Sequence, residues 1–240
     1  MTTPHTTVRI WTVTLYDDGM IVAGKCPATA DELRAASERG FDAVELHLTT
    51  DDLDSIDETA ATCRAAPVEI VSAHTPHVDR DELGYVQRTN DLCERLDATL
   101  VVHSTKIPLG DIGEVLASTD ITVPHGFENS TGHSLHFLRN VLLDEGRPLV
   151  LDTAHLYTAE EAYCSILEDL LAEHGDSIPV VHCCDGTKIA DGLAFGTGTM
   201  DMERVIAALD ENYDGIVVLE VMPDEQADAL EMWRDVALRD

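Results

Sequence analysis

Short, continuous apolar runs alternate with longer amphipathic segments along most of the chain. The runs are rich in Val, Ile and Leu, as expected of parallel strands that are covered on both faces. Eight runs of this kind lie at residues 8–14, 43–47, 68–74, 99–103, 121–128, 149–152, 179–182 and 216–220. We predict that each run forms a buried β-strand.

The segments between the runs carry the start and stop signals of helices. Thr29-x-x-Glu32 has the spacing of a capping box, and Gly40 follows the last turn of the helix that this box would start. Further helices are predicted at residues 51–66, 81–97, 111–118, 131–144, 159–174, 202–209 and 224–238.

Strict alternation of strand and helix predicts a parallel sheet with right-handed crossovers. Eight such units in 240 residues match a single (β/α)8 TIM barrel, an α/β fold, with one domain over residues 1–240. A doubly wound open sheet is the alternative. It is disfavoured because the first predicted turn, at residues 14–19, has no G-x-G-x-x-G pattern.

The charge balance is strongly acidic, with 46 Asp and Glu against 15 Lys and Arg and a net charge of −31. Since 44% of the residues are hydrophobic, a packed core is expected rather than disorder. An acidic surface of this kind is typical of halophilic proteins. It disfavours a nucleic-acid partner, because such binding depends on Lys and Arg that neutralise phosphates.

The chain shows no sign of export or of a membrane span. Its first residues lack a basic segment followed by an apolar core, and no apolar run approaches the roughly 20 residues that cross a bilayer. The six cysteines include no Cys-x-x-Cys pair. We therefore expect a cytoplasmic protein whose thiols are reduced and buried.

Carboxylates and histidines stand at the ends of most predicted strands. Active sites of barrels lie at this C-terminal face. Several carboxylates in one barrel mouth would repel each other, and a divalent cation would resolve that repulsion. The sequence therefore predicts a metal site built from strand-end residues, for which the candidates are His74, His103, Glu128, Asp152, His182 and Glu220.

The order and spacing of these strand ends resemble the xylose isomerase-like barrel superfamily. That superfamily includes sugar epimerases such as D-tagatose 3-epimerase and also endonuclease IV (AP endonuclease family 2). The resemblance spans nearly the whole chain, through GFDAVELHL (40–48), VSAHTP (71–76), LVVHS (100–104), FENSTG (127–132), LDTAH (151–155), HCCDGTK (182–188), GTGTMD (196–201) and VVLEVMP (217–223).

The epimerase branch implies one metal and two catalytic carboxylates. Its ligand set corresponds to Glu128, Asp152, His182 and Glu220, and the two glutamates would also move protons alpha to a carbonyl. The resemblance implies Mn²⁺, Zn²⁺, Co²⁺ or Mg²⁺ as cofactor. Substrate contacts would come from His155, Lys188, Glu45 and His47, although Lys188 replaces an arginine of the family.

The endonuclease IV branch implies a different use of the same face. Its first zinc would bind His74, His103 and Glu128, so that a second ion per chain, bridged by Glu128, stays open. Its third zinc needs His155 and an Asp-x-His motif, but this chain has Asp191-Gly192-Leu193 there. A zinc phosphoesterase is therefore the alternative to a sugar isomerase or epimerase.

The partner expected under the first reading is a small, neutral or weakly charged molecule, because the mouth segments at residues 49–55 and 77–84 are mostly acidic. The resemblance is also consistent with a homodimer. Trp11 and Phe195 are candidates for apolar walls of a sugar site. Gly196-x-Gly198 resembles a phosphate-binding loop, although two glycines are weak evidence for one.

Overall fold

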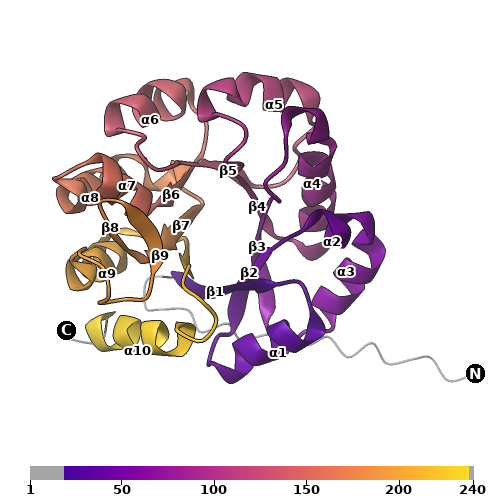
Figure 1. Cartoon of the computed structure of the whole chain (residues 1–240), viewed down its shortest axis with the longest axis horizontal. Coiled ribbons are helices and arrows are strands. Elements are labelled where there is room, and N and C mark those ends of the chain that lie inside the picture. Colours follow the sequence, from indigo (N-terminus) through magenta and orange to yellow (C-terminus); the bar gives the residue numbers. More distant parts are fainter. Residues whose placement is uncertain (1–18, 238–240) are drawn as a thin grey trace, which may run out of the picture.

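A computed structural model describes residues 19–237 of the chain. Eight parallel strands close into a barrel in the order β1-β10-β7-β6-β5-β4-β3-β2, and the helices surround it (Figure 1). The barrel strands are β1 (Ile21–Pro27), β2 (Ala43–His47), β3 (Glu69–His74), β4 (Thr99–Val102), β5 (His125–Glu128), β6 (Leu149–Asp152), β7 (Val180–Cys183) and β10 (Ile216–Leu219). The predicted (β/α)8 fold is confirmed.

The first barrel strand is the main difference from the prediction. The predicted strand at residues 8–14 lies outside the described residues, and β1 closes the barrel by pairing with both β10 and β2. The sequence pattern missed β1 because Gly24 and Lys25 interrupt its apolar run. A Cβ at Gly24 would lie 3.1 Å from the Phe41 ring, a tight contact that a larger residue would relieve only if the ring moved.

The helices follow the predicted alternation. They are α1 (Ala30–Glu38), α2 (Thr50–Asp54), α3 (Ile56–Arg64), α4 (Gly84–Leu96), α5 (Ile112–Ser118), α6 (Leu135–Val141), α7 (Thr153–Ala159), α8 (Tyr163–His174), α9 (Met202–Asn212) and α10 (Gln226–Ala237). Thr29 caps α1, with its Oγ1 accepting from the Glu32 amide at 3.4 Å, which is one of the two hydrogen bonds of the predicted capping box. None of these helices is both long and apolar enough to cross a membrane.

Three local features were not predicted. The single helix expected at residues 51–66 is two helices, divided at Ser55. Helix α7 begins directly after β6, where Asp152 caps it by accepting from the His155 amide at 2.7 Å. A hairpin of β8 (Asp185–Thr187) and β9 (Ala190–Leu193) follows β7. Helix α7 and the hairpin thus each follow a strand that carries a predicted ligand, Asp152 on β6 and His182 on β7.

The barrel interior is filled by small and β-branched side chains. Val150, Val180 and Val218 lie in this interior cluster with residues from four other strands. Each of the three stands two residues before a predicted ligand, so strand alternation places the ligand on the same inward face, one layer higher. The apolar barrel core therefore forms a floor under the polar site. All six cysteines are buried and free, as predicted.

Candidate metal centre

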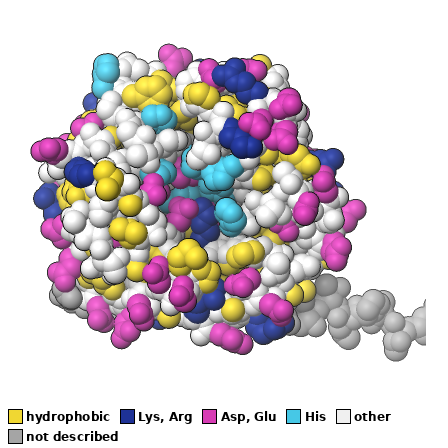
Figure 2. Space-filling model, viewed as in Figure 1, with side chains coloured by type: hydrophobic (Ala, Val, Ile, Leu, Met, Phe, Trp, Pro, Cys, Tyr) yellow, Lys and Arg dark blue, Asp and Glu magenta, His cyan; other side chains and the backbone are white. Residues whose placement is uncertain are grey.

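Histidine, acidic and basic side chains gather in a hollow on one end of the barrel (Figure 2). The cavity there measures about 230 Å³. Seven predicted site residues line it together, namely His47, His74, His103, Glu128, Asp152, His155 and Glu220. Lys25 and His77 also line this cavity and were not predicted.

One cluster of potential ligands is formed by His74, His103 and Glu128. Glu128 Oε2 lies 3.2 Å from His74 Nε2 and 3.1 Å from His103 Nδ1, and the two ring nitrogens are 3.3 Å apart. In a tetrahedral zinc site with bonds of about 2.0–2.1 Å, neighbouring ligand atoms lie about 3.3 Å apart. The three atoms are therefore already spaced as ligands of one ion.

The protonation state of His74 supports the same interpretation. Its Nδ1 lies 2.7 Å from the Thr75 carbonyl oxygen and donates to it, which leaves a lone pair on Nε2. Burial, reinforced by Lys25, lowers the pKa of His74 to about 4, so the ring is neutral at pH 7. The lone pair of Nε2 then faces the Glu128 carboxylate with no proton between them, an arrangement that a cation would stabilise.

A second cluster contains Glu128, Asp152, His182 and Glu220, whose ligand atoms all lie within 4.8 Å of one another. His182 Nδ1 lies 2.8 Å from Glu220 Oε2 and 3.3 Å from Glu128 Oε1. Both His182 Nδ1 and Glu220 Oε2 are buried without a hydrogen-bond partner. Burial raises the pKa of Asp152 to about 6. The charge of His155 opposes this rise, whereas the negative charges of Glu220 and Glu128 add to it.

Glu128 belongs to both clusters, and its two oxygens are divided between them. Oε2 faces His74 and His103, whereas Oε1 faces His182. This is the arrangement expected of a bridging carboxylate. Within the described residues, no third group of three or more such side chains comes together. The donor set and its unpaired buried atoms fit one or two divalent metal ions.

Glu45 lies beneath His182 rather than at the cavity surface. It is fully buried, accepts from Ser72 Oγ at 2.8 Å, and lies 3.1–3.2 Å from His182 Nε2. Burial alone would raise its pKa, but His182 and Lys25 together lower it to about 2. An ionised Glu45 holds the His182 Nε2 proton and so turns Nδ1 toward the ligand cluster.

Lys25 is the site residue that the sequence reasoning missed. Its Nζ lies 2.6 Å from Glu220 Oε1 and 3.2 Å from Glu45 Oε1, and its side chain is 10% exposed. Burial opposes its charge, but the attraction of Glu220, Glu45 and Glu128 outweighs this and raises the pKa of Lys25 above its usual value. The signal that could have found it is a lysine within an apolar run of a chain with only three lysines.

His155 lies at the cavity wall and is held on both ring nitrogens. Nδ1 lies 2.7 Å from the Asn129 carbonyl oxygen, and Nε2 lies 3.0 Å from Asp191 Oδ2. Burial opposes its charge, but Asp152 and Glu128 raise the pKa of His155 overall. Asp191 thus contacts His155, but the two belong to no group of three or more potential ligands among the described residues.

The remaining predicted substrate contacts divide between the cavity and the surface. His47 lines the cavity with its ring centroid 6.1 Å from that of His74. Lys188 Nζ instead donates to the Tyr157 carbonyl oxygen at 2.5 Å and lies 3.9 Å from the centroid of the Tyr157 ring. The structure therefore does not bring Lys188 to the cavity lining.

The glycine loop binds a carboxylate of its own chain. Asp185 is fully buried and accepts from the amides of Gly196 at 2.9 Å and Gly198 at 2.8 Å, and also from those of Gly186 and Met200. The donors that suggested a phosphate-binding loop are therefore occupied. Phe195 packs, partly buried, against the main apolar core, and Trp11 lies outside the described residues.

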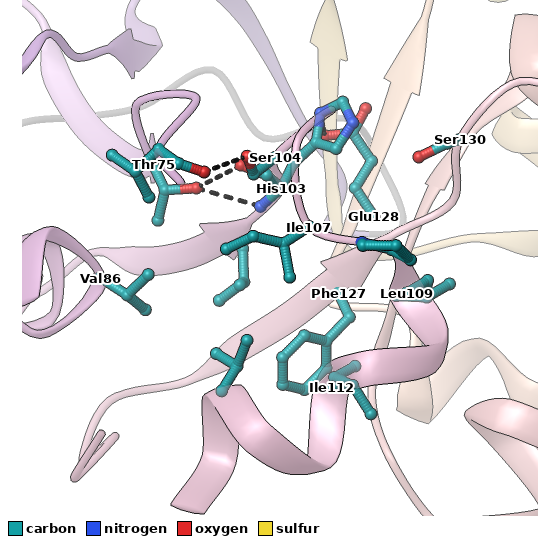
Figure 3. A pocket seen from close by; sticks show the side chains of 14 residues that line it. Thr75, Val86, His103, Ser104, Ile107, Leu109, Ile112, Phe127, Glu128 and Ser130 are labelled. Atoms are coloured by element: carbon teal, nitrogen blue, oxygen red, sulfur yellow. Dashed lines mark hydrogen bonds and ion pairs between the residues drawn. The ribbon is translucent and has the colours of Figure 1, made fainter. Parts of the chain in front are cut away.

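A small apolar pocket lies behind His103 and Glu128, between β5, α4 and α5 (Figure 3). Its volume is about 30 Å³, and its walls include Val86, Ile112 and Phe127. Beside it, Thr75 Oγ1 donates to the His103 carbonyl at 2.7 Å and accepts from the His103 amide at 3.0 Å. These two bonds fix the backbone from which His103 reaches the cluster.

A (β/α)8 barrel with histidines and carboxylates at the strand ends defines the class of the protein. The family described as xylose isomerase-like TIM barrel matches residues 112–236, more than half of the chain. The chain therefore belongs to this family. A comparison with curated proteins found no match.

Solved structures with the same fold include several sugar epimerases. A D-tagatose 3-epimerase-like protein has a TM-score of 0.70 and 21% identity, over 90% of this chain and 98% of that chain. The 3-keto-D-glucoside 4-epimerase of E. coli has a TM-score of 0.67 and 17% identity, over 90% and 99%. A D-allulose 3-epimerase from Methylomonas sp. has a TM-score of 0.65 and 17% identity, over 90% and 98%. At these identities the similarity concerns the fold.

Proposed function

We propose that this protein is a divalent-metal-dependent isomerase or epimerase of a sugar or a sugar-like polyol or keto compound. The observation that carries the proposal is that Glu128 and Glu220, from two different strands, both face His182 Nδ1 at the floor of one cavity. Glu128, Asp152, His182 and Glu220 would hold the metal. When bound, the ion supplies Lewis-acid polarisation of the substrate carbonyl.

The two glutamates would carry the proton transfer. An epimerisation removes a proton alpha to the carbonyl on one face and returns a proton on the other, so it needs acid–base groups on two sides of the substrate, a role that two carboxylates can fill. Glu220 keeps 30% of its side chain exposed, whereas Glu128 keeps 2%. Glu220 is therefore the more accessible base, and Glu128 would act from the deeper side of the cavity.

The charged groups around the cavity favour a substrate without a phosphate. Among the described residues that line it and the adjoining hollow, the lysines are Lys25 and Lys106, and there is no arginine. Lys25 is paired with Glu220 and Glu45, and Lys106 with Asp79 at 3.0 Å. The charges of both lysines are thus already paired with carboxylates and would not offset the double charge of a phosphate, so we propose a neutral, polyhydroxylated substrate.

The test is solvent exchange of the proton alpha to the carbonyl. The protein, loaded with Mn²⁺ or Co²⁺ in high KCl, is incubated in D₂O with a panel of ketoses and inosose-like compounds. We expect deuterium to enter one substrate class, and Glu220→Gln to abolish this while Glu231→Gln, an exposed position on α10, leaves it unchanged. Absence of exchange with every compound would contradict the proposal.

A second candidate is a zinc phosphoesterase, which the cluster of His74, His103 and Glu128 favours. Under that proposal Glu128 would bridge two zinc ions, and an abasic oligonucleotide or a smaller phosphoester would be cleaved. His103→Ala would remove both the second zinc and the cleavage. A single metal ion per chain, with no cleavage, would exclude this candidate.

A further inference from the structure

Lys25 is a buried cation in the floor of the cavity, and neither proposed function uses it. It lies on β1, which pairs with β2 and β10, the strands of Glu45 and Glu220. Its side chain is 10% exposed, and it lines the cavity beside His47, His74 and Glu220. The small exposed part of Lys25 therefore faces the space where a substrate would lie.

The hydrogen-bonding capacity of the ammonium group is only partly used. An ammonium has three N–H donors. Among the described residues, Nζ makes one hydrogen bond, to Glu220 Oε1 at 2.6 Å, and one ion pair, with Glu45 Oε1 at 3.2 Å. Glu45 Oε1 itself has no hydrogen-bond partner. Within residues 19–237, at least one donor of Lys25 is thus left for a group that enters the cavity.

The two oxygens of Glu220 have different surroundings. Oε2 is buried and faces His182 Nδ1 at 2.8 Å, on the side of the ligand cluster. Oε1 is the oxygen that accepts from Lys25. Since Oε2 is buried on the side of the ligand cluster, we assign Oε1, which lies beside Lys25, to the proton transfer. A proton taken from a substrate would therefore arrive beside the Lys25 ammonium.

We propose that Lys25 is a further catalytic residue, which donates a hydrogen bond to the substrate oxygen that gains negative charge. The inference rests on the proposed isomerase or epimerase function. In the step, the proton alpha to the carbonyl moves to Glu220 Oε1, and the C–H electron pair forms the new C=C bond. The carbonyl π pair moves onto the carbonyl oxygen, which accepts from Lys25 Nζ. The return of a proton to carbon reverses these movements.

The competing explanation is that Lys25 only neutralises Glu45 and Glu220. Two variants separate the explanations, Lys25→Met, which keeps the length without the charge, and Lys25→Arg, which keeps the charge. Arg88→Met on α4, an exposed residue paired with Asp54, is the matched control. For each protein we would measure the melting temperature, the Mn²⁺ dissociation constant by calorimetry, and kcat and KM for deuterium exchange.

We expect Lys25→Met to lower kcat by about 10²–10³-fold, the usual effect of removing one donor to a developing oxyanion. Its Mn²⁺ affinity should be unchanged or higher, because the variant removes a cation and no ligand. Lys25→Arg should recover part of kcat, and Arg88→Met should match the wild type. A parallel fall of kcat and Mn²⁺ affinity, or an unchanged kcat in Lys25→Met, would overturn the proposal.

A wild type that exchanges no proton would refute the proposed function, and Lys25 would then be judged by ligand binding alone. Sorbitol and xylitol would be titrated into the Mn²⁺-loaded wild type and variants. Loss of one hydrogen bond to a polyol oxygen should weaken binding about tenfold in Lys25→Met. Equal polyol affinity in the wild type and Lys25→Met would show that Lys25 contacts no ligand. If Lys25→Met does not fold, Lys25→Arg and Lys25→Gln carry the comparison.

Discussion

Replacing Glu45 by Gln should misalign the metal centre without touching any predicted ligand. The Glu45 carboxylate is fully buried and contacts three donors, Ser72 Oγ at 2.8 Å, His182 Nε2 at 3.1–3.2 Å and Lys25 Nζ at 3.2 Å. Gln has the same size, but its amide has one acceptor oxygen and places an NH₂ group where a second acceptor stood. The NH₂ group then replaces an acceptor for at least one of these three groups, and of the three only the Ser72 hydroxyl can accept a hydrogen bond from it.

Two quantities should change as a result. A group that orients a metal-binding histidine typically contributes about 10–100-fold in metal affinity, so Mn²⁺ should bind more weakly by about that factor. Removing one partner of a buried charge pair also destabilises the fold by about 3–5 kcal/mol. Here Lys25 keeps Glu220 at 2.6 Å as a second partner, so we expect the lower end of that range, about 3 kcal/mol.

Calorimetric titration with Mn²⁺ and denaturant unfolding of the metal-free protein measure the two effects. Glu69→Gln is the matched control, since Glu69 is exposed at the opposite end of the neighbouring strand β3. It should leave both quantities unchanged. If Glu45→Gln retained wild-type Mn²⁺ affinity, the idea that Glu45 sets the orientation of His182 would be refuted.

Three further outcomes are expected. Gly198→Ala should lower the free energy of unfolding by about 3 kcal/mol, because the new Cβ would lie 2.3 Å from Asp185 Oδ1. The control Gly113→Ala on α5, whose Cβ would meet nothing within 4 Å, should not lower it. Equal melting curves for the two variants would disprove this prediction. Mn²⁺ affinity should fall as the pH drops below about 6, because Asp152 is then protonated and must release a proton to bind the ion. Equal Mn²⁺ affinity from pH 5 to 8 by calorimetry would contradict this expectation. Mn²⁺ at 100 times its dissociation constant should stabilise the fold by about 2.7 kcal/mol in thermal unfolding, an effect that EDTA reverses and that Asp152→Asn should lack.

Most of the barrel could be predicted because its strands are continuous apolar runs. β2 and β6 have the predicted bounds, and the other predicted barrel strands within the described residues differ by a few residues at their ends. β1 could not be recognised in this way, because its lysine is buried by pairing with carboxylates from β2 and from the end of β10. Those partners are distant in sequence, so no local pattern shows that a charge can be accommodated inside this strand.

The gathering of the site residues followed from the same alternation. Residues two positions beyond interior valines had to share one face, which brought Asp152, His182 and Glu220 together. The burial of Glu45 and the position of Lys188 could not be predicted from this alternation. Strand-end position alone does not distinguish a residue at the cavity surface from one beneath a ligand, and the contact of Lys188 with the Tyr157 carbonyl depends on how helix α7 packs.

The metal content of protein purified without added metal tests the central claim most directly. Elemental analysis should find at least one divalent ion per chain in the wild type, and Asp152→Asn and His182→Ala should lose it. One ion per chain favours the isomerase or epimerase proposal, and two zinc ions per chain favour the phosphoesterase. A folded wild-type protein that holds no divalent ion, and takes none up when Mn²⁺, Co²⁺ or Zn²⁺ is supplied, would contradict the account.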